Sequence, residues 1–226
     1  MSGLAGWVAR CRTRRGLHLL VANVRILIGF GFLPAGLKKL LGERFTDAGN
    51  VGPFHDFLHA FWATGPLYRF VGIVQLTGAL LLMSQRFAAA GAALLLPVLS
   101  VIAVFVWSTA GVPTIATVTL MLGGVIALLF WDHHRWRALF VEGAAPVAMP
   151  RAADLIDTRL WERAGLAVAL LYFASCLVHG GVYRPRGADW SEPAFYVLPL
   201  VMVVPLVALL AGRRASATSD STRKLP

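Results

Sequence analysis

Apolar residues fill six long runs of this chain, and short segments rich in charged residues, glycine or proline separate them. Each run comes close to the ~20 residues that a helix needs to cross a bilayer. The period-2 alternation of a membrane β-barrel is missing, and in hydrocarbon a helix pairs every backbone N–H and C=O within one segment. The pattern therefore predicts an all-α, polytopic membrane helix bundle. Its predicted spans are residues 18–38, 67–84, 88–108, 113–131, 162–182 and 194–212.

Composition supports a membrane environment, since 58% of the 226 residues are hydrophobic and 14% are charged. With a cytoplasmic N-terminus, fourteen of the 21 Lys and Arg residues lie on the inner side, six lie on the outer side, and Arg25 lies within a span. The positive-inside rule then predicts that both termini are cytoplasmic and that the protein is a multi-pass protein of the inner (plasma) membrane. Because topology and anionic lipid account for the net charge of +10, nucleic acid is not an expected partner.

The first four predicted spans follow one another closely, whereas a polar stretch from Asp132 to about Leu160 separates them from the last two. We therefore expect a four-helix core with a C-terminal helical hairpin. The expected divisions are a basic cytoplasmic N-terminus over 1–17, the membrane core over 18–140, a cytoplasmic linker over 141–160, a two-helix membrane extension over 161–212 and a Ser/Thr-rich, disordered tail over 213–226.

A stripe of five residues, at alternating four- and three-residue steps, marks the first predicted span: Arg25, Gly29, Phe32, Gly36 and Lys39. At 100° per residue the five share one helical face, and the glycines allow another helix to approach closely. An arginine within a membrane span costs several kcal/mol unless its charge is satisfied, so it indicates a functional or a structural role.

The five N–H donors of Arg25 need partners, and no Asp or Glu lies in the interior of a predicted span, since Glu162 is the first residue of the fifth. Gln75 in the second span is the expected side-chain partner, since both residues are predicted near the middle of the bilayer; freed carbonyls, water or the headgroup region are alternatives. One interpretation is a helix clamp made by Arg25 and Gln75. The other is a binding site for a quinone or a small anion, in which these two residues contact the ligand.

The order of these motifs is similar to that in a known family. The pattern Arg25-x3-Gly29-x2-Phe32-x3-Gly36-x2-Lys39 is followed by an outer segment with Phe45 and an FxxFL-like patch, then by Gly72-x2-Gln75-x2-Gly78, a Leu run and Arg86. Over about residues 20–140 the chain thus resembles the DoxX family of four-helix membrane proteins. Many members look to have Glu where this chain has Gln75, a departure that weakens the idea of an Arg–Glu pair or a proton relay at this place.

The resemblance implies a DoxX-like core and a redox-associated role, because the family includes membrane subunits linked to thiosulfate:quinone oxidation and proteins of redox-maturation complexes. We expect an accessory or scaffold subunit of a quinone-linked complex that is not catalytic alone. The alternatives are a quinone-reactive oxidoreductase subunit, with quinone as cofactor, or a carrier of a small anion or lipid. Expected partners are the lipid bilayer, a redox partner protein and further copies of the chain.

Residues 53–64 read as a short amphipathic helix on the outer surface, between the first two spans. Two histidines with an i,i+4 spacing and a neighbouring acid lie on its polar face, and basic residues lie close by. These outer-mouth candidates are Lys38, His55, Asp56, His59 and Arg69. Two histidines and one acid are a weak metal signal, so no metal site is predicted, and the basic residues favour an anionic substrate or headgroup.

Other chemistry-bearing residues have ordinary structural interpretations. His133 and His134, in WDHHRWR after the fourth span, are typical of interfacial anchoring, and Cys11 and Cys176 lie too far apart in the topology to pair. His179 lies one turn after Cys176, but a metal site would need further groups. The sequence contains no Walker loop, GxGxxG fingerprint, GxSxG elbow, CxxCH or zincin motif.

Overall fold

The computed structural model describes residues 3–140, 152–182, 203–204 and 207–208. Most of these residues are helical and none of them forms a strand, which confirms the all-α class. The elements are α1 (Gly3–Cys11), α2 (Arg15–Leu40), α3 (Pro53–Ala63), α4 (Pro66–Met83), α5 (Ala88–Thr109), α6 (Val112–Trp131), α7 (His133–Phe140), the 3-10 turn η1 (Ala152–Asp154) and α8 (Thr158–His179). In the described part of the chain, five helices are long and apolar enough to cross a membrane: α2, α4, α5, α6 and α8. The protein is therefore a multi-pass membrane protein, and the predicted span 194–212 falls almost entirely outside the described residues.

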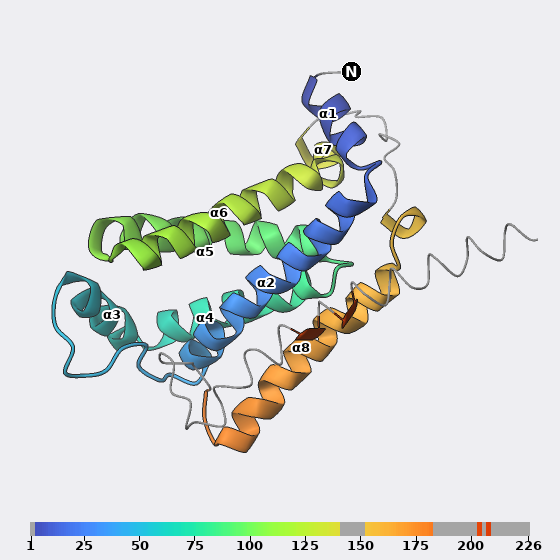
Figure 1. The fold of residues 1–226 in the computed structure, drawn as a ribbon. Coiled ribbons are helices and arrows are strands. Elements are labelled where there is room, and N and C mark those ends of the chain that lie inside the picture. Colours follow the sequence, from blue (N-terminus) through green and yellow to red (C-terminus); the bar gives the residue numbers. More distant parts are fainter. Residues whose placement is uncertain (1–2, 141–151, 183–202, 205–206, 209–226) are drawn as a thin grey trace, which may run out of the picture.

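Four of these helices form a bundle in which each packs on the next, and α6 also contacts α2 (Figure 1). Glycines set the separations between helices. A Cβ on Gly72 of α4 would lie 2.8 Å from the carbonyl oxygen of Gly36 on α2, and a Cβ on Gly91 of α5 would lie 2.7 Å from that of Gly78 on α4. Side chains at these positions would separate the helices. The predicted close approach along the stripe of α2 is thus present.

Helix α8 packs against α2 and α4 and shares their hydrophobic core, to which it contributes Trp161, Val168 and Tyr172. The contact is close at Gly165, where a Cβ would overlap the carbonyl oxygen of Met83. This helix begins four residues before its predicted start at residue 162. The carboxylate of Asp157 accepts a hydrogen bond from the backbone N–H of Leu160 (3.1 Å) and caps the helix there.

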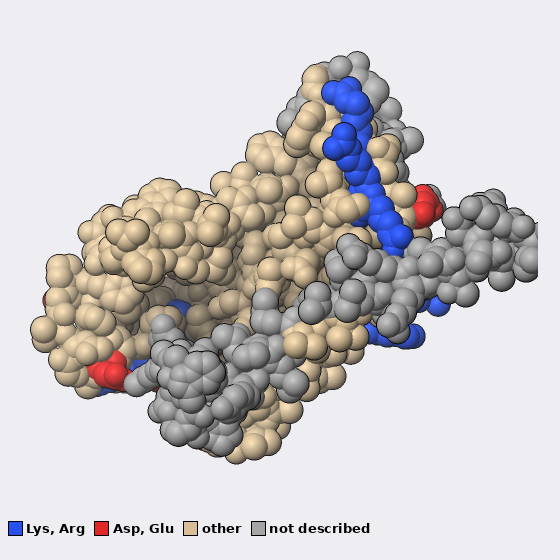
Figure 2. Space-filling model, in the orientation of Figure 1, with Lys and Arg blue, Asp and Glu red and all other residues tan. Residues whose placement is uncertain are grey.

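The two ends of the bundle differ (Figure 1). One end carries α1, α7 and Asp132, and we call it the Asp132 end. The other, the α3 end, carries the predicted amphipathic helix, which forms over Pro53–Ala63. The rings of Phe54 and Phe57 lie 5.2 and 4.3 Å from that of Phe105, so this helix covers the end of α5. Figure 2 shows a row of basic side chains running down from α1 along one edge, whereas most of the remaining described surface in this view is uncharged.

Candidate functional site

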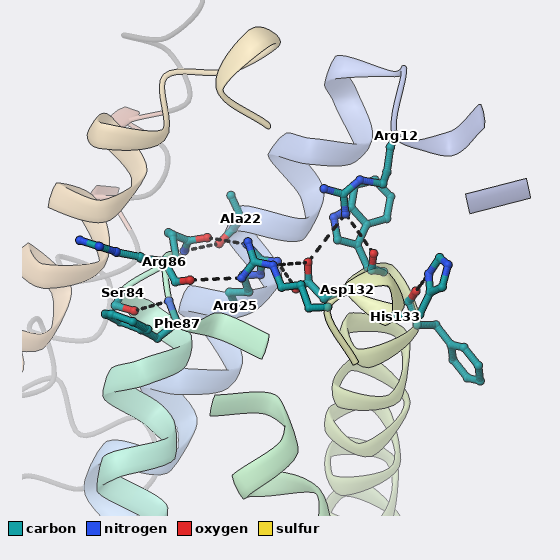
Figure 3. Close-up of polar contacts among 12 residues, drawn as sticks. Arg12, Ala22, Arg25, Ser84, Arg86, Phe87, Asp132 and His133 are labelled. Atoms are coloured by element: carbon teal, nitrogen blue, oxygen red, sulfur yellow. Dashed lines mark hydrogen bonds and ion pairs between the residues drawn. The ribbon is translucent and has the colours of Figure 1, made fainter. Parts of the chain in front are cut away.

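A buried carboxylate gathers arginines from three elements at the Asp132 end (Figure 3). Asp132 directly follows α6 as its C-cap residue and is 2% exposed. Its Oδ2 accepts a hydrogen bond from Nη2 of Arg25 at 2.6 Å, and its Oδ1 lies 3.7 Å from Nη1 of Arg12 and 3.9 Å from Nε of Arg135. One negative charge therefore holds together α2, the segment after α1, and α7.

Arg25 is 9% exposed and has a second partner on the turn between α4 and α5. Its Nη1 donates to Oε1 of Gln85 (3.4 Å), and Nε2 of Gln85 donates to the carbonyl of Ala22 on α2 (3.2 Å). The backbone of Gln85 has φ 60, a left-handed conformation that non-glycine residues seldom adopt. Nε of Arg25 is buried and has no hydrogen-bond partner among the residues that the structure describes.

The expected contact between Arg25 and Gln75 does not form. Gln75 lies beside Gly36, where a glycine Cβ would be 3.2 Å from the Cβ of Gln75. Gly36 is eleven residues along α2 from Arg25, which is about 16 Å at the helical rise. The prediction was wrong because hydropathy locates span ends to within a few residues, whereas pairing depends on the register between helices. Gln75 is fully buried, and neither of its side-chain polar atoms has a hydrogen-bond partner in the described part of the chain.

An acidic residue outside the predicted spans pairs with Arg25. Asp132 lies one residue beyond the end of α6, and its carboxylate accepts a hydrogen bond from the guanidinium. The expectation that carbonyls, water or headgroups must satisfy the guanidinium is corrected by this contact. The sequence signal that could have found it is that Asp132 directly follows the last residue of the fourth predicted span. The segment WDHHRWR was interpreted as an interfacial anchor, so Asp132 was not among the predicted partners of Arg25.

Arg12 and His18 complete the cluster, and neither was among the predicted site residues. Nη1 of Arg12 donates to the carbonyl of Trp131 (3.0 Å), and its guanidinium lies 5.2 Å from the ring centroid of the same tryptophan. Nε2 of His18 donates to the carbonyl of Arg12 (2.8 Å), and the ring of His18 meets that of Trp131 edge-on at 5.1 Å. Burial lowers the pKa of Arg12 below its usual value, and the negative charge of Asp132 partly offsets this lowering. An arginine nevertheless stays protonated at neutral pH.

These residues border a cavity of about 250 Å³. It lies between the Asp132 ends of α2 and α8, with Trp131 and Trp161 among its walls. Four arginines and two carboxylates are among the described residues that line it: Arg12, Arg25, Arg86, Arg135, Asp132 and Glu162. The lining therefore has an excess of two positive charges, and an anion is the ligand that such a lining favours.

The outer-mouth candidates lie at the other end of the bundle, so the structure does not bring them together with Arg25. Nζ of Lys39 donates to the carbonyl of Ala35 (3.2 Å) and lies 4.5 Å from the ring centroid of Phe45. The guanidinium of Arg69 packs beside Gly42, about 3.1 Å from where a Cβ would lie. Lys38 is in the last turn of α2.

The histidines of α3 hold the preceding loop in place. A hydrogen bond of 2.6 Å joins Nδ1 of His55 to Oγ1 of Thr46, and Nε2 of His59 donates to the carbonyl of Asn50 (3.2 Å). Asp56 lies in the first turn of α3. Among the described residues, no group of three or more His, Cys, Asp or Glu side chains could hold a metal ion, and both cysteines are free thiols.

Comparisons with protein families, with characterised proteins and with solved structures found no match for this chain.

Proposed function

We propose that this protein binds a small anionic group, either an inorganic oxyanion or the headgroup of an amphiphile, in the arginine-lined cavity of the Asp132 end. The observation that carries the proposal is the incomplete hydrogen bonding of the Arg25 guanidinium. Its two Nη atoms are held by Asp132 and Gln85, while its buried Nε has no hydrogen-bond partner among the described residues. An unsatisfied buried donor costs free energy, and the negative charge of an anion in the cavity that Arg25 lines would stabilise the guanidinium that carries this donor.

The charge of the cavity favours this function over the binding of a quinone. A quinone carbonyl is neutral and needs one or two donors, whereas a lining with an excess of two positive charges gains more from a negatively charged ligand. By the positive-inside rule, we propose that the Asp132 end faces the cytoplasm of an inner membrane. DoxX family membership and an accessory role beside a redox partner are also proposals, and they rest on the motif spacing of the first two spans.

Equilibrium dialysis of delipidated protein with radiolabelled phosphate, at constant ionic strength, tests the proposal. Arg135 lines the cavity and its side chain is 45% exposed, so Arg135→Gln can be made with little risk to the fold. Loss of one charge-assisted hydrogen bond, about 1.5 kcal/mol, should raise the phosphate Kd roughly tenfold.

Arg163→Gln is the matched control, because Arg163 is an exposed residue of α8 that does not line the cavity. Its Kd should equal that of the unmodified protein. Phosphate uptake that does not saturate, or that both variants reduce equally, would overturn the proposal.

A further inference from the structure

A second cavity adjoins the arginine-lined one at the Asp132 end. It measures about 360 Å³ and lies between α4 and α8, and we call it the apolar groove. Apart from the two charged residues discussed below, its lining is mostly apolar: Leu80, Met83, Ser84, Phe87, Gly165, Leu166 and Ala169. Its shape depends on Gly165, which lets α8 approach the carbonyl of Met83.

Two charged residues belong to both cavities and mark the boundary between them. Arg86 and Glu162 line the arginine-lined cavity on one side and the apolar groove on the other. Figure 3 shows Arg86 extending from the turn after α4 toward α8, on the side of Arg25 opposite Asp132. Its guanidinium lies 5.3 Å from the ring centroid of Phe87, which lines the groove. A cationic compartment thus continues directly into an apolar one.

The apolar groove lies on surfaces that face hydrocarbon. Both α4 and α8 are long and apolar enough to cross a membrane. Three groove residues on or beside these helices keep much of their surface exposed: Leu80 is 42% exposed, Phe87 52% and Leu166 59%. In a bilayer such a surface is covered by acyl chains, so the groove is reached from the lipid phase.

We infer that an anionic phospholipid binds here, with its phosphate in the arginine-lined cavity beside Arg86 and one acyl chain in the apolar groove. The inference rests on the proposed anion binding and names the class of ligand that supplies the anion. An acyl chain that moves from the surrounding lipid into the groove gains no hydrophobic free energy, because both environments are apolar. The charge of the headgroup therefore provides the selectivity, and the groove provides van der Waals packing for the chain. Basic pockets between membrane helices recognise anionic headgroups by the same electrostatics.

Native mass spectrometry of delipidated protein, supplied with phosphatidylglycerol or phosphatidylcholine of identical chains, tests the inference. Retention of phosphatidylglycerol should exceed that of phosphatidylcholine by roughly fivefold or more. Leu166→Trp fills the groove at an exposed position and should lower phosphatidylglycerol retention roughly fivefold. Leu170→Trp is the control, since Leu170 is 58% exposed on the same helix and does not line the groove.

The outcomes separate this inference from the proposed function. If Leu166→Trp loses phosphatidylglycerol but still binds radiolabelled phosphate, both the cavity and the groove are supported as described. Three results would each overturn the lipid inference: equal retention of the two lipids, unchanged phosphatidylglycerol retention in Leu166→Trp, or a bound quinone that is lost in Leu166→Trp. If the same protein still binds phosphate, the proposed function remains supported. A protein that binds neither phosphate nor phosphatidylglycerol overturns both.

Discussion

Removing the charge of Asp132 should destabilise the protein more than any other single neutralisation at this end. The carboxylate is 2% exposed and lies within 4 Å of three guanidinium groups, the closest being that of Arg25 at 2.6 Å. Breaking a buried ion pair by removing one partner costs about 3–5 kcal/mol, because the remaining charge is left uncompensated. At about 2–4 °C per kcal/mol for a chain of this size, Asp132→Asn should lower the Tm by roughly 6–20 °C.

A double-mutant cycle tests whether this loss arises from the pair. Arg25→Met should also destabilise, because Asp132 then loses its closest partner. The combined Arg25→Met/Asp132→Asn variant should lose less than the sum of the two single variants, by about 2 kcal/mol, since neither charge is then left buried against a missing partner. The assay is thermal unfolding in a neutral detergent, followed by tryptophan fluorescence and by size-exclusion chromatography of the heated samples.

Asp154→Asn is the matched control, because Asp154 is an exposed acid of η1 at the same end of the protein. It should shift the Tm by no more than about 2 °C, as exposed charges contribute little. The reasoning fails if Asp132→Asn behaves like this control, or if the two single losses add without coupling.

Three further predictions concern other parts of the bundle. Gly165→Ala should destabilise by about 1–3 kcal/mol, because its Cβ would overlap the carbonyl of Met83, whereas Gly123→Ala, where a Cβ meets no atom within 4 Å, should not lower the Tm. Gln75→Met should raise stability by about 1–2 kcal/mol, since it removes buried polar atoms that have no partner among the described residues, and a lowered Tm would contradict this. Burial and then the charge of Arg12 lower the pKa of His134 from 6.5 to about 4, so between these values the unfolded state binds more protons. The Tm should therefore fall as pH drops below about 6.5, and less steeply in His134→Gln.

Helix lengths and close approaches were predictable because each depends on local sequence. Apolar runs located all five spans in the described part of the chain, and the spacing of Gly29 and Gly36 indicated the face of α2 that contacts another helix. The boundary of α8 was missed by four residues, because hydropathy does not register the cap made by Asp157.

The partners of Arg25 were not predictable from the same information. They come from the ends of α4 and α6, at positions 85 and 132, and their arrival depends on the register of three helices. A shift of one helical turn, about 5.4 Å, would separate the guanidinium from Asp132, yet it would leave the hydropathy profile unchanged. Sequence periodicity therefore identified the residue that needs a partner, and packing selected the partner.

The same charges would link the stability of the protein to the ligand binding that we propose at the Asp132 end. A single carboxylate aligns the guanidinium groups of Arg12, Arg25 and Arg135, but it neutralises one positive charge, and Glu162 offsets another. The remaining positive charges repel one another in a partly buried cavity, and this repulsion destabilises the folded state. An anion in the cavity would reduce the repulsion. Any ligand that binds the folded state in this way also stabilises it, by an amount that rises with the ratio of its concentration to its Kd. If an anionic lipid binds as we propose, it would hold together the ends of α2, α6 and α8, and the binding site would then also contribute to the stability of the fold.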